Sequence, residues 1–296
     1  MRGTFAKNLI ELASVDPSII LLTGDLGYSV LEDFAKLFPE RFYNVGVAEQ
    51  SLIGTAAGLA SQGLKVFAYS IGNFPVFRAL EQIRNDVYYH NSSVCIVGVG
   101  SGFDYGSAGY SHWMIEDVAA ISALENFGIF TPSSEQSVIN CLNEFINGKD
   151  PIYLSLGKLP NESASKRVVP KFLDGGGWAL YRSTSPKDLV FTSGSITHDV
   201  LASSSKELLG TVISCERLQP IDFSAVESYI KDADSIKVVE ERIWAGGLGS
   251  RLLKHLSLSK QNPHFSWYGV NSTNLTHTAG DRRYQLETNG FAFLFD

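Results

Sequence analysis

The sequence has few cysteines, no long apolar run and no basic cluster, and each absence narrows the possible functions. The three cysteines, Cys95, Cys141 and Cys215, are far apart and odd in number, so they indicate neither a disulfide framework nor a metal site. Cys95 lies in the apolar run from Val94 to Val99, where a core position is expected. A reducing, cytoplasmic setting is therefore expected.

Membrane insertion and nucleic-acid binding are not expected either. No run approaches the ~18 apolar residues that would span a membrane, and Met1 to Glu11 is an amphipathic, helix-like segment without a signal-peptide core. The formal net charge is −7, and the lysines and arginines are scattered rather than gathered in a stripe. The sequence therefore favours neither a nucleic acid nor a membrane as a partner.

The composition, 44% hydrophobic and 19% charged residues in a chain of 296, is typical of a soluble globular protein. Two domains are expected, because a single core stops growing near ~250–300 residues. Apolar runs of strand length alternate with helical patterns, which predicts parallel sheets covered by helices on both faces. The predicted fold class is α/β, with two tandem domains at 1–160 and 187–296 and a polar linker at 161–186.

The expected elements follow from these runs. In the first domain, strands are expected at 19–22, 42–45, 64–69, 94–99, 128–131 and 152–156. The first-domain helices are expected at 5–13, 75–89, 115–124 and 135–146, with a helix of small residues after 45. In the second domain, strands are expected at 189–192, 211–214, 236–239 and 265–268, and helices at 196–208, 223–230 and 248–256.

The most informative segment places Glu49 between a short strand and the small-residue helix. A carboxylate at such a junction is commonly a helix cap, because the first turn favours negative charge. The stretch V-G-V-A-E-Q, followed by G-x-A-A-G-L-A, resembles the signature of the pyrimidine-binding domain of transketolases. The resemblance implies that Glu49 binds thiamine diphosphate and is its catalytic carboxylate. Such a carboxyl group, hydrogen-bonded to the aminopyrimidine ring, favours the imino tautomer of the cofactor. The small residues that follow, from Gly54 to Ala60, fit either a subunit contact or packing on the domain's own sheet.

The segment from Tyr69 to Arg84 resembles the transketolase stretch S-T-F-x-x-F…R-A-x-D-Q-I-R, whose aromatic residues stack on the cofactor. A gapless comparison puts Gly72 and Pro75 where the family has phenylalanine. Phe74 and Phe77 are then the candidates for the cofactor-binding aromatic residues. The alternative is that both are core phenylalanines at helical spacing.

His112 lies in a stretch that resembles the family loop G-E-D-G-P-T-H-Q-x-x-E-D. The resemblance implies that His112 is catalytic and contacts the oxygens of the two-carbon fragment, which suits an imidazole near neutral pH. The alternative is a cap or surface histidine. Ala108 replaces the acidic residue of the family loop.

Further cofactor and substrate contacts are implied near the N-terminus. The segment Thr23 to Ser29 resembles the family's A-D-L segment, which places Asp25 at the cofactor and Ser29 at a substrate phosphate. Arg2 has the spacing of a transketolase arginine that binds the same phosphate, and a guanidinium suits that contact. The alternative for Arg2 is a frayed terminus.

Two other phosphate contacts of the family are missing from this sequence. Gly100 stands where transketolases have a histidine, and Ser155-Leu156 stands where they have an arginine. Lys158 is the candidate that partly substitutes for them.

The second domain resembles the transketolase C-terminal domain in Thr192 to Ser195 and in Val239 to Ser250. The latter is similar to E-E-H-x-x-x-G-G-L-G-S, with Arg242 in place of the histidine. A glycine-rich turn before a helix can bind an anion. A structural role is the favoured alternative, since the family's C-terminal domain is mainly structural.

The G-D-G…N-N motif that anchors the diphosphate through Mg²⁺ is absent, since the chain has Gly24-Asp25-Leu26 and no Asn-Asn pair. The resemblance therefore covers only the second and third domains of a transketolase. It implies the C-terminal subunit of a split enzyme that transfers a two-carbon ketol unit from a ketose or ketose phosphate to an aldose.

The missing motif also implies a partner. An N-terminal subunit would carry the G-D-G…N-N motif and bind Mg²⁺, thiamine diphosphate would be shared, and the assembly would be a two-plus-two heterotetramer. No metal site is expected in this chain. The alternatives are a subunit similar to 1-deoxyxylulose-5-phosphate synthase or to the 2-oxo-acid dehydrogenase beta type, and a non-catalytic assembly partner.

Overall fold

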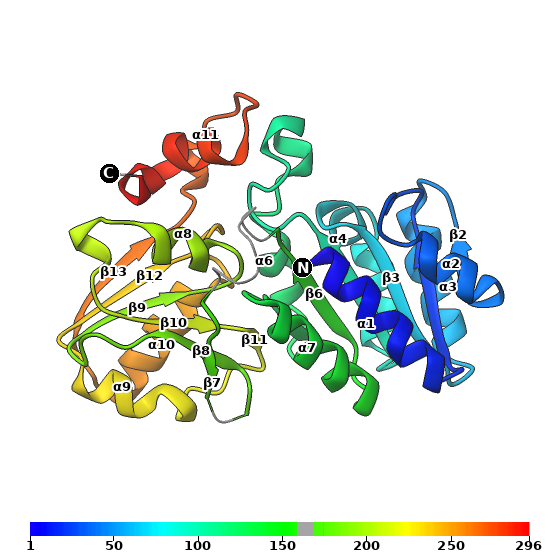
Figure 1. Ribbon diagram of the computed structural model, residues 1–296, viewed down its shortest axis with the longest axis horizontal. Helices are drawn as coiled ribbons and strands as arrows, with labels where there is room; N and C mark the ends of the chain where they lie inside the picture. Colours follow the sequence, from blue (N-terminus) through cyan, green and yellow to red (C-terminus); the bar gives the residue numbers. More distant parts are fainter. Residues whose placement is uncertain (159–167, 174, 296) are drawn as a thin grey trace.

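The computed structural model describes residues 1–158, 168–173 and 175–295. It contains two sheets, each flanked by helices, which lie next to each other along the longest axis of the molecule (Figure 1). Each sheet is mostly parallel, so the predicted α/β fold class with two tandem units is confirmed. We call the first sheet with its helices the first unit, and the second sheet with its helices the second unit.

The first sheet has the strand order β11-β5-β6-β4-β3-β1-β2. Neighbouring strands from β5 to β2 in that order are parallel, and β11 is antiparallel to β5. Strands β1, β4 and β6 are buried at every position, which explains their continuous apolar sequences. The strands are β1 (Ile19–Thr23), β2 (Phe42–Asn44), β3 (Lys65–Ile71), β4 (Val94–Val99), β5 (Gly128–Phe130), β6 (Ile152–Leu156) and β11 (Arg217–Gln219).

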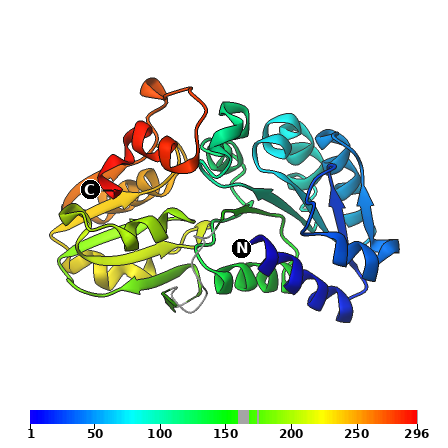
Figure 2. The same ribbon diagram turned by 45° about the horizontal axis from the view of Figure 1, so that its top comes forward.

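Helices cover both faces of the first sheet. On one face α1 and α7 lie together (Figure 2), and α3, α4 and α6 pack against the other. The helix predicted at 75–89 is interrupted, because Ala79 leaves the helical conformation with φ −125° and ψ 23°. The helices are α1 (Arg2–Val15), α2 (Glu32–Leu37), η1 (Pro39–Arg41), α3 (Glu49–Ala60), α4 (Asn73–Arg78), α5 (Leu80–Gln82), η2 (Ile83–Tyr88), η3 (Gly106–Ala108), η4 (Tyr110–His112), α6 (Asp117–Ser122) and α7 (Glu135–Asn147).

The second sheet has the strand order β13-β12-β9-β10-β8-β7, and its last two strands are antiparallel. The strands are β7 (Lys171–Phe172), β8 (Trp178–Arg182), β9 (Asp188–Thr192), β10 (Thr211–Cys215), β12 (Ser235–Val239) and β13 (His264–Tyr268). The helices are α8 (Ile196–Ala202), η6 (Lys206–Leu208), η7 (Ser224–Val226), α9 (Glu227–Asp232), α10 (Leu248–Ser259), η8 (Ser272–Asn274), α11 (Arg282–Leu286), η9 (Glu287–Phe291) and η10 (Ala292–Leu294).

The linker prediction needs a correction in its C-terminal part. Strands β7 and β8 fall within 161–186, and both belong to the second sheet. Strand β7 is a two-residue, partly exposed strand at the sheet edge, so it needs no apolar run. Strand β8 lies between β10 and β7 and is mostly buried, and it was missed because it directly follows the glycine-rich stretch of the predicted linker. Residues 161–167 of the predicted linker lie outside the described residues.

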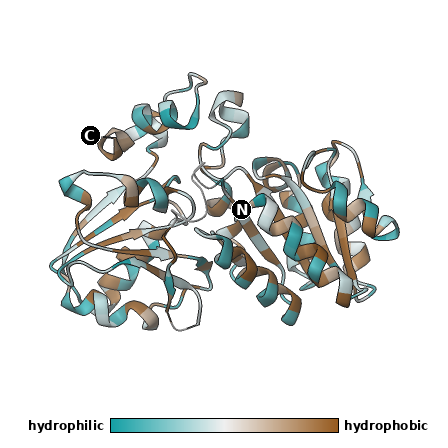
Figure 3. Cartoon of the chain, in the orientation of Figure 1, coloured by the Kyte–Doolittle hydropathy of each residue, from teal (hydrophilic) through white to brown (hydrophobic). Residues whose placement is uncertain are grey.

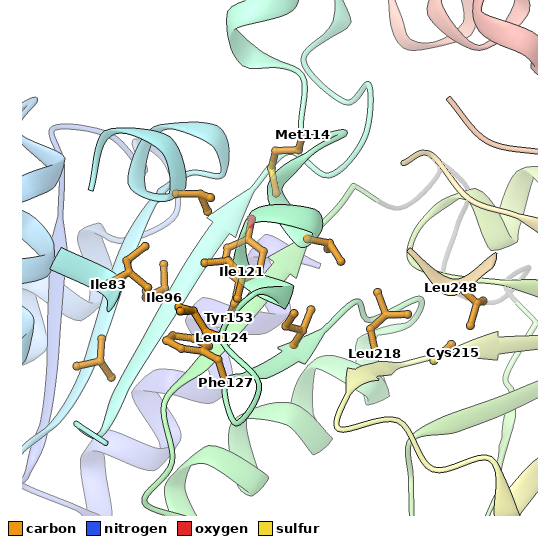
Figure 4. Packing of buried hydrophobic residues seen from close by; sticks show 14 of the residues in the cluster. Ile83, Ile96, Met114, Ile121, Leu124, Phe127, Tyr153, Cys215, Leu218 and Leu248 are labelled. Carbon is orange, nitrogen blue, oxygen red and sulfur yellow. The ribbon is translucent and has the colours of Figure 1, made fainter. Parts of the chain in front are cut away.

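A continuous core and a shared strand join the two units. The chain leaves β10 of the second sheet and adds β11 to the first sheet, next to β5. Figure 3 shows hydrophobic residues concentrated in both sheets, with hydrophilic residues on the outer helix faces. One apolar cluster runs from Ile121 and Phe127 through Leu218 to Leu248 (Figure 4). In the described part of the chain, no helix combines the length and apolar character needed to cross a bilayer.

Candidate functional site

The predicted site residues lie at one edge of the first sheet. They come from the loops and helix starts that follow the carboxyl ends of β1, β2, β3, β4 and β6, with Arg2 at the start of α1. The carboxyl ends of parallel strands are the usual position of ligand sites in open α/β sheets. The residues are Arg2, Asp25, Ser29, Glu49, Phe74, Phe77, His112 and Lys158.

Glu49 is the first residue of α3 and is 3% exposed. Its Oε2 accepts a hydrogen bond from Arg78 Nη1 at 2.8 Å. Its other oxygen, Oε1, is buried and has no hydrogen-bond partner among the described residues. The buried oxygen without a partner among the described residues remains available to a ligand donor.

Phe74, Phe77 and His112 come together around the same arginine. The Arg78 guanidinium lies 4.3 Å from the centre of the Phe74 ring, and the His112 ring meets Phe74 edge-on at 5.0 Å. Phe77 is 50% exposed, so it is not a core residue. Phe74, Phe77 and Arg78 border a surface cavity of about 460 Å³. The cavity is lined by Asn73, Phe74, Phe77, Arg78, Tyr110, Ser111 and Glu116.

Asp25 and Ser29 lie on the exposed loop after β1, and both have a positive φ, 59° and 63°. The Asn44 side chain ties this loop to the end of β2: its Oδ1 accepts the Asp25 N–H at 2.9 Å, and its Nδ2 donates to Asp25 Oδ1 at 3.0 Å. The Ser29 N–H donates to Glu32 Oε1 at 2.6 Å. Hydrogen bonds therefore hold Asp25 and Ser29 in defined turns, where both residues are exposed to solvent.

Arg2 and Lys158 gather around Tyr105. The Lys158 ammonium lies 4.5 Å from the centre of the Tyr105 ring and donates to the Asp104 carbonyl at 2.8 Å. Burial raises the pKa of Tyr105, and the positive charge of Arg2 opposes that rise. The Tyr105 ring also occupies the space in front of Gly100, where an added Cβ would lie 2.1 Å from it. The space in front of Gly100 is therefore filled by a tyrosine from the same loop.

Arg78, Tyr110 and Glu116 belong to this region and were not predicted as site residues. The Tyr110 hydroxyl donates to Glu116 Oε1 at 2.8 Å. Burial raises the pKa of Glu116, and the hydrogen bond from Tyr110 opposes the rise. The only sequence signal was their place within the two stretches that resemble the family motifs.

The matching family model is described as "Transketolase, pyrimidine binding domain", and it covers residues 1–160. This range is more than half of the chain. The chain belongs to the transketolase family.

Two relatives and one solved structure of this family match over most of the chain. An apulose-4-phosphate transketolase subunit of Phocaeicola vulgatus is 30% identical over 266 residues, which covers 88% of this chain and 84% of the relative. A protein of Methanocaldococcus jannaschii described as "Putative transketolase C-terminal section" is 30% identical over 275 residues, covering 92% and 86%. The structure described as "Split gene transketolase, inactive beta4 tetramer" superposes with a TM-score of 0.80 at 30% identity, covering 99% of this chain and 96% of that chain. The predicted resemblance to the C-terminal subunit of a split transketolase is confirmed.

In this transketolase-family chain, the glycine-rich turn before α10 does not offer an open anion site. The Glu240 carboxylate already accepts the N–H groups of Leu248 at 2.8 Å and Gly249 at 2.9 Å. The Trp267 indole N–H donates to the same carboxylate at 2.9 Å. Burial raises the pKa of Glu240, and these donors oppose the rise. The Glu240 carboxylate therefore occupies the N–H groups that an anion would need, which favours the structural role.

A larger surface cavity, about 900 Å³, lies away from the predicted residues. It is lined by residues such as Gly63, Lys65 and Ser93, which precede or begin β3 and β4, so it lies at the amino edge of the sheet. That edge is not where parallel α/β sheets usually bind ligands. In the part of the chain that the structure describes, no cluster of three or more His, Cys, Asp or Glu could hold a metal ion.

Proposed function

We propose that this chain is the C-terminal subunit of a split, thiamine diphosphate-dependent transketolase. It would transfer a two-carbon ketol unit from a ketose or ketose phosphate to an aldose acceptor. The observation that carries the proposal is the buried Glu49 carboxylate, with one oxygen held by Arg78 and the other without a partner among the described residues, beside two accessible phenylalanines.

The residues present fit the pyrimidine half of thiamine diphosphate. A buried acceptor without a donor is unfavourable in the free protein, and a ring N–H or protonated ring nitrogen of the cofactor would satisfy Glu49 Oε1. Phe74 and Phe77 would flank the aromatic ring, and Asp25 would contact the cofactor from the β1 loop. When bound, the cofactor supplies the electron sink for breaking and making carbon–carbon bonds.

Each protein group then has a defined task. Arg78 fixes the Glu49 carboxylate through Oε2 at 2.8 Å and leaves Oε1 to hold or share a proton with the pyrimidine ring. Ser111 Oγ lies 3.0 Å from His112 Nδ1, which orients the imidazole. His112 would then present Nε2 to the oxygens of the two-carbon fragment.

Recognition of a substrate phosphate would rest on fewer cations than in the family pattern. Ser29, Arg2 and Lys158 are the groups on this edge that would contact it, because Gly100 and Ser155 offer no positive charge. A weak preference for phosphorylated sugars follows from this reduced set.

The exposed apolar side chains on the edge that carries Glu49 support a partner subunit. Several large side chains in the loops, strand ends and helices of this edge are at least 46% exposed. Large apolar side chains that gather on one exposed surface commonly mark an interface. The residues are Tyr28, Tyr43, Val47, Phe77 and Tyr110. A subunit with the G-D-G…N-N motif would close over them, bring Mg²⁺ and the diphosphate site, and form a two-plus-two heterotetramer.

A mixing experiment tests this function. The purified chain, the subunit with the G-D-G…N-N motif, thiamine diphosphate and Mg²⁺ are combined, and each component is omitted in turn. Turnover is expected only in the complete mixture, and turnover by the isolated chain contradicts the proposal.

The donor distinguishes the proposed reaction from that of the 1-deoxyxylulose-5-phosphate synthase-like alternative. With hydroxypyruvate a ketol product extended by two carbons is expected. With pyruvate little product is expected. Since both donors release CO₂, the carbon skeleton of the product must be determined by NMR or mass spectrometry.

A further inference from the structure

The loop that carries His112 starts and ends in the first unit, but part of it packs into the core of the second unit. It leaves β4 at Gly100 and ends at Asp117, the first residue of α6. Three of its large apolar residues are fully buried in a cluster formed mainly by the second sheet and its helices. Those residues are Phe103, Trp113 and Ile115, which join Val190, Val239 and Leu286.

A segment of the second unit runs along the neck of this loop. The neck is closed by a pair of backbone hydrogen bonds between Gly102 and Met114, at 3.1 and 2.9 Å. Glu241 lies directly against Gly102, where an added Cβ would be 2.6 Å from its side chain. The Ile243 N–H donates to the Ile115 carbonyl at 3.1 Å.

Arg242, between these two residues, reaches both ends of the loop. Its side chain is almost fully buried, and its Nη2 donates to Ser101 Oγ at 3.0 Å and to Ser155 Oγ at 2.7 Å. Its Nε lies 3.8 Å from Oδ1 of the buried Asp117, whose Oδ2 accepts the Tyr153 hydroxyl at 2.8 Å. One guanidinium thus bridges the second residue of the loop, the first residue of α6 and strand β6.

We propose that Arg242 is a positioning residue, which holds the loop at both ends from the second unit and so keeps His112 against Phe74. The effect of this positioning on turnover rests on the proposed function, in which His112 contacts the substrate. A guanidinium presents several donors in a fixed plane, and a lysine at this position would satisfy only some of the three contacts. Removing the cation also leaves Asp117 buried without its counter-ion, a change that is strongly unfavourable.

The two departures from the family pattern meet in this bridge. Arg242 stands where the similar transketolase stretch has a histidine, and Ser155-Leu156 stands where the resemblance implies an arginine. Arg242 and Ser155 are in hydrogen-bond contact at 2.7 Å. The positive charge beside Ser155 therefore comes from Arg242 of the second unit. Because this guanidinium is buried, it contacts the loop rather than solvent.

Hydrogen exchange of the isolated full chain, read by mass spectrometry, tests the positioning role without partner, cofactor or turnover. In Arg242→Gln the amides of Gly102 and Met114 are expected to exchange at least about tenfold faster than in the wild type, while those of α1 keep their rates. Arg217→Gln is the matched control. It breaks the 2.6 Å ion pair with Glu144, which lies between the shared strand and α7 and does not touch the loop. Loop exchange is expected to stay unchanged in this control.

Two results would overturn the proposal. One is unchanged loop exchange in Arg242→Gln, and the other is equal acceleration in the loop and in α1, which would make Arg242 a general stability residue. If Arg242→Gln does not fold, Arg242→Lys is measured instead. Its loop amides are expected to exchange faster than in the wild type, and those of α1 at the wild-type rate. Failure of the mixing experiment would leave these exchange rates untouched, so the two failures are distinguishable.

Discussion

The carboxyl group of Asp104, in the loop that carries His112, makes the stability of the protein depend on pH. Its side chain is fully buried and accepts the Lys158 N–H at 2.6 Å. Arg282 Nε lies 3.5 Å from it, but the same guanidinium is shared with Glu241 at 3.1 Å and with Asp199 at 2.7 Å. Burial, followed by the charge of Glu241, raises the pKa of Asp104 from 3.8 to about 7, against the opposing charges of Arg282 and Lys158.

The sign of the effect follows from this rise. In the folded state Asp104 keeps its proton up to about pH 7, whereas in the unfolded chain it loses the proton near pH 3.8. The stabilisation is therefore complete below the unfolded pKa and is lost as the pH rises through the folded pKa. The slope is about 1.4 kcal/mol per pH unit, so this carboxyl alone removes about 2–3 kcal/mol of unfolding free energy between pH 5 and pH 7.

Urea unfolding of the wild type and of Asp104→Asn between pH 5 and pH 7 measures this loss. The asparagine keeps the shape and an acceptor for the Lys158 N–H but cannot ionise. The unfolding free energy of the wild type is expected to fall by about 2–3 kcal/mol relative to Asp104→Asn over this range. Asp33→Asn, which changes an exposed carboxylate, should leave the wild-type profile as it is. Parallel profiles for wild type and Asp104→Asn would refute the reasoning.

Three further changes test single features of the structure. Phe77→Ser should change the unfolding free energy by no more than about 0.5 kcal/mol, because Phe77 is half exposed, yet weaken thiamine diphosphate binding in the mixed complex by about tenfold or more. An unchanged cofactor titration would argue against its stacking role. Gly100→Ala should destabilise the chain by about 1–3 kcal/mol, because its φ is +92° and the new Cβ meets Tyr105 at 2.1 Å. Tyr105→Ala in the same chain should recover part of that loss in urea unfolding, and a Gly100→Ala variant as stable as wild type would contradict the contact. Glu240→Gln should lower the unfolding free energy by about 1.5–3 kcal/mol, because a charged acceptor of two backbone N–H groups and the Trp267 indole is lost. An unchanged unfolding free energy in urea would show that these hydrogen bonds of Glu240 contribute little to stability.

The sequence predicted the first sheet and the place of Glu49 well, for a local physical reason. Strands β4 and β6 are buried on both faces, so their apolar runs are continuous and their bounds are visible in the sequence. Glu49 is recognisable because a strand, a short turn and a small-residue helix follow one another directly. Phe74, Phe77 and His112 were predicted from motif spacing alone, and the structure brings them to one edge.

The features that the sequence did not predict depend on contacts between distant segments. Strand β11 is a short, polar-flanked segment whose pairing with β5 follows only from the way in which the two units dock. The Arg78–Glu49 ion pair joins residues 29 positions apart, and the Arg242–Ser101 hydrogen bond joins residues 141 positions apart. Local periodicity carries no information on such pairs.

The proposed function depends above all on the Glu49 carboxyl group, which would perform acid–base work on thiamine diphosphate at a subunit junction. The most direct measurement is kcat of the reconstituted complex with Glu49→Gln, which keeps the shape of the side chain and removes its ionisable group. The account predicts a fall of about 10²–10⁴-fold, with the folded chain and its partner binding retained. Glu81→Gln, which changes an exposed carboxylate in the helix after α4, should keep full activity. Wild-type kcat in the Glu49→Gln complex would contradict the account.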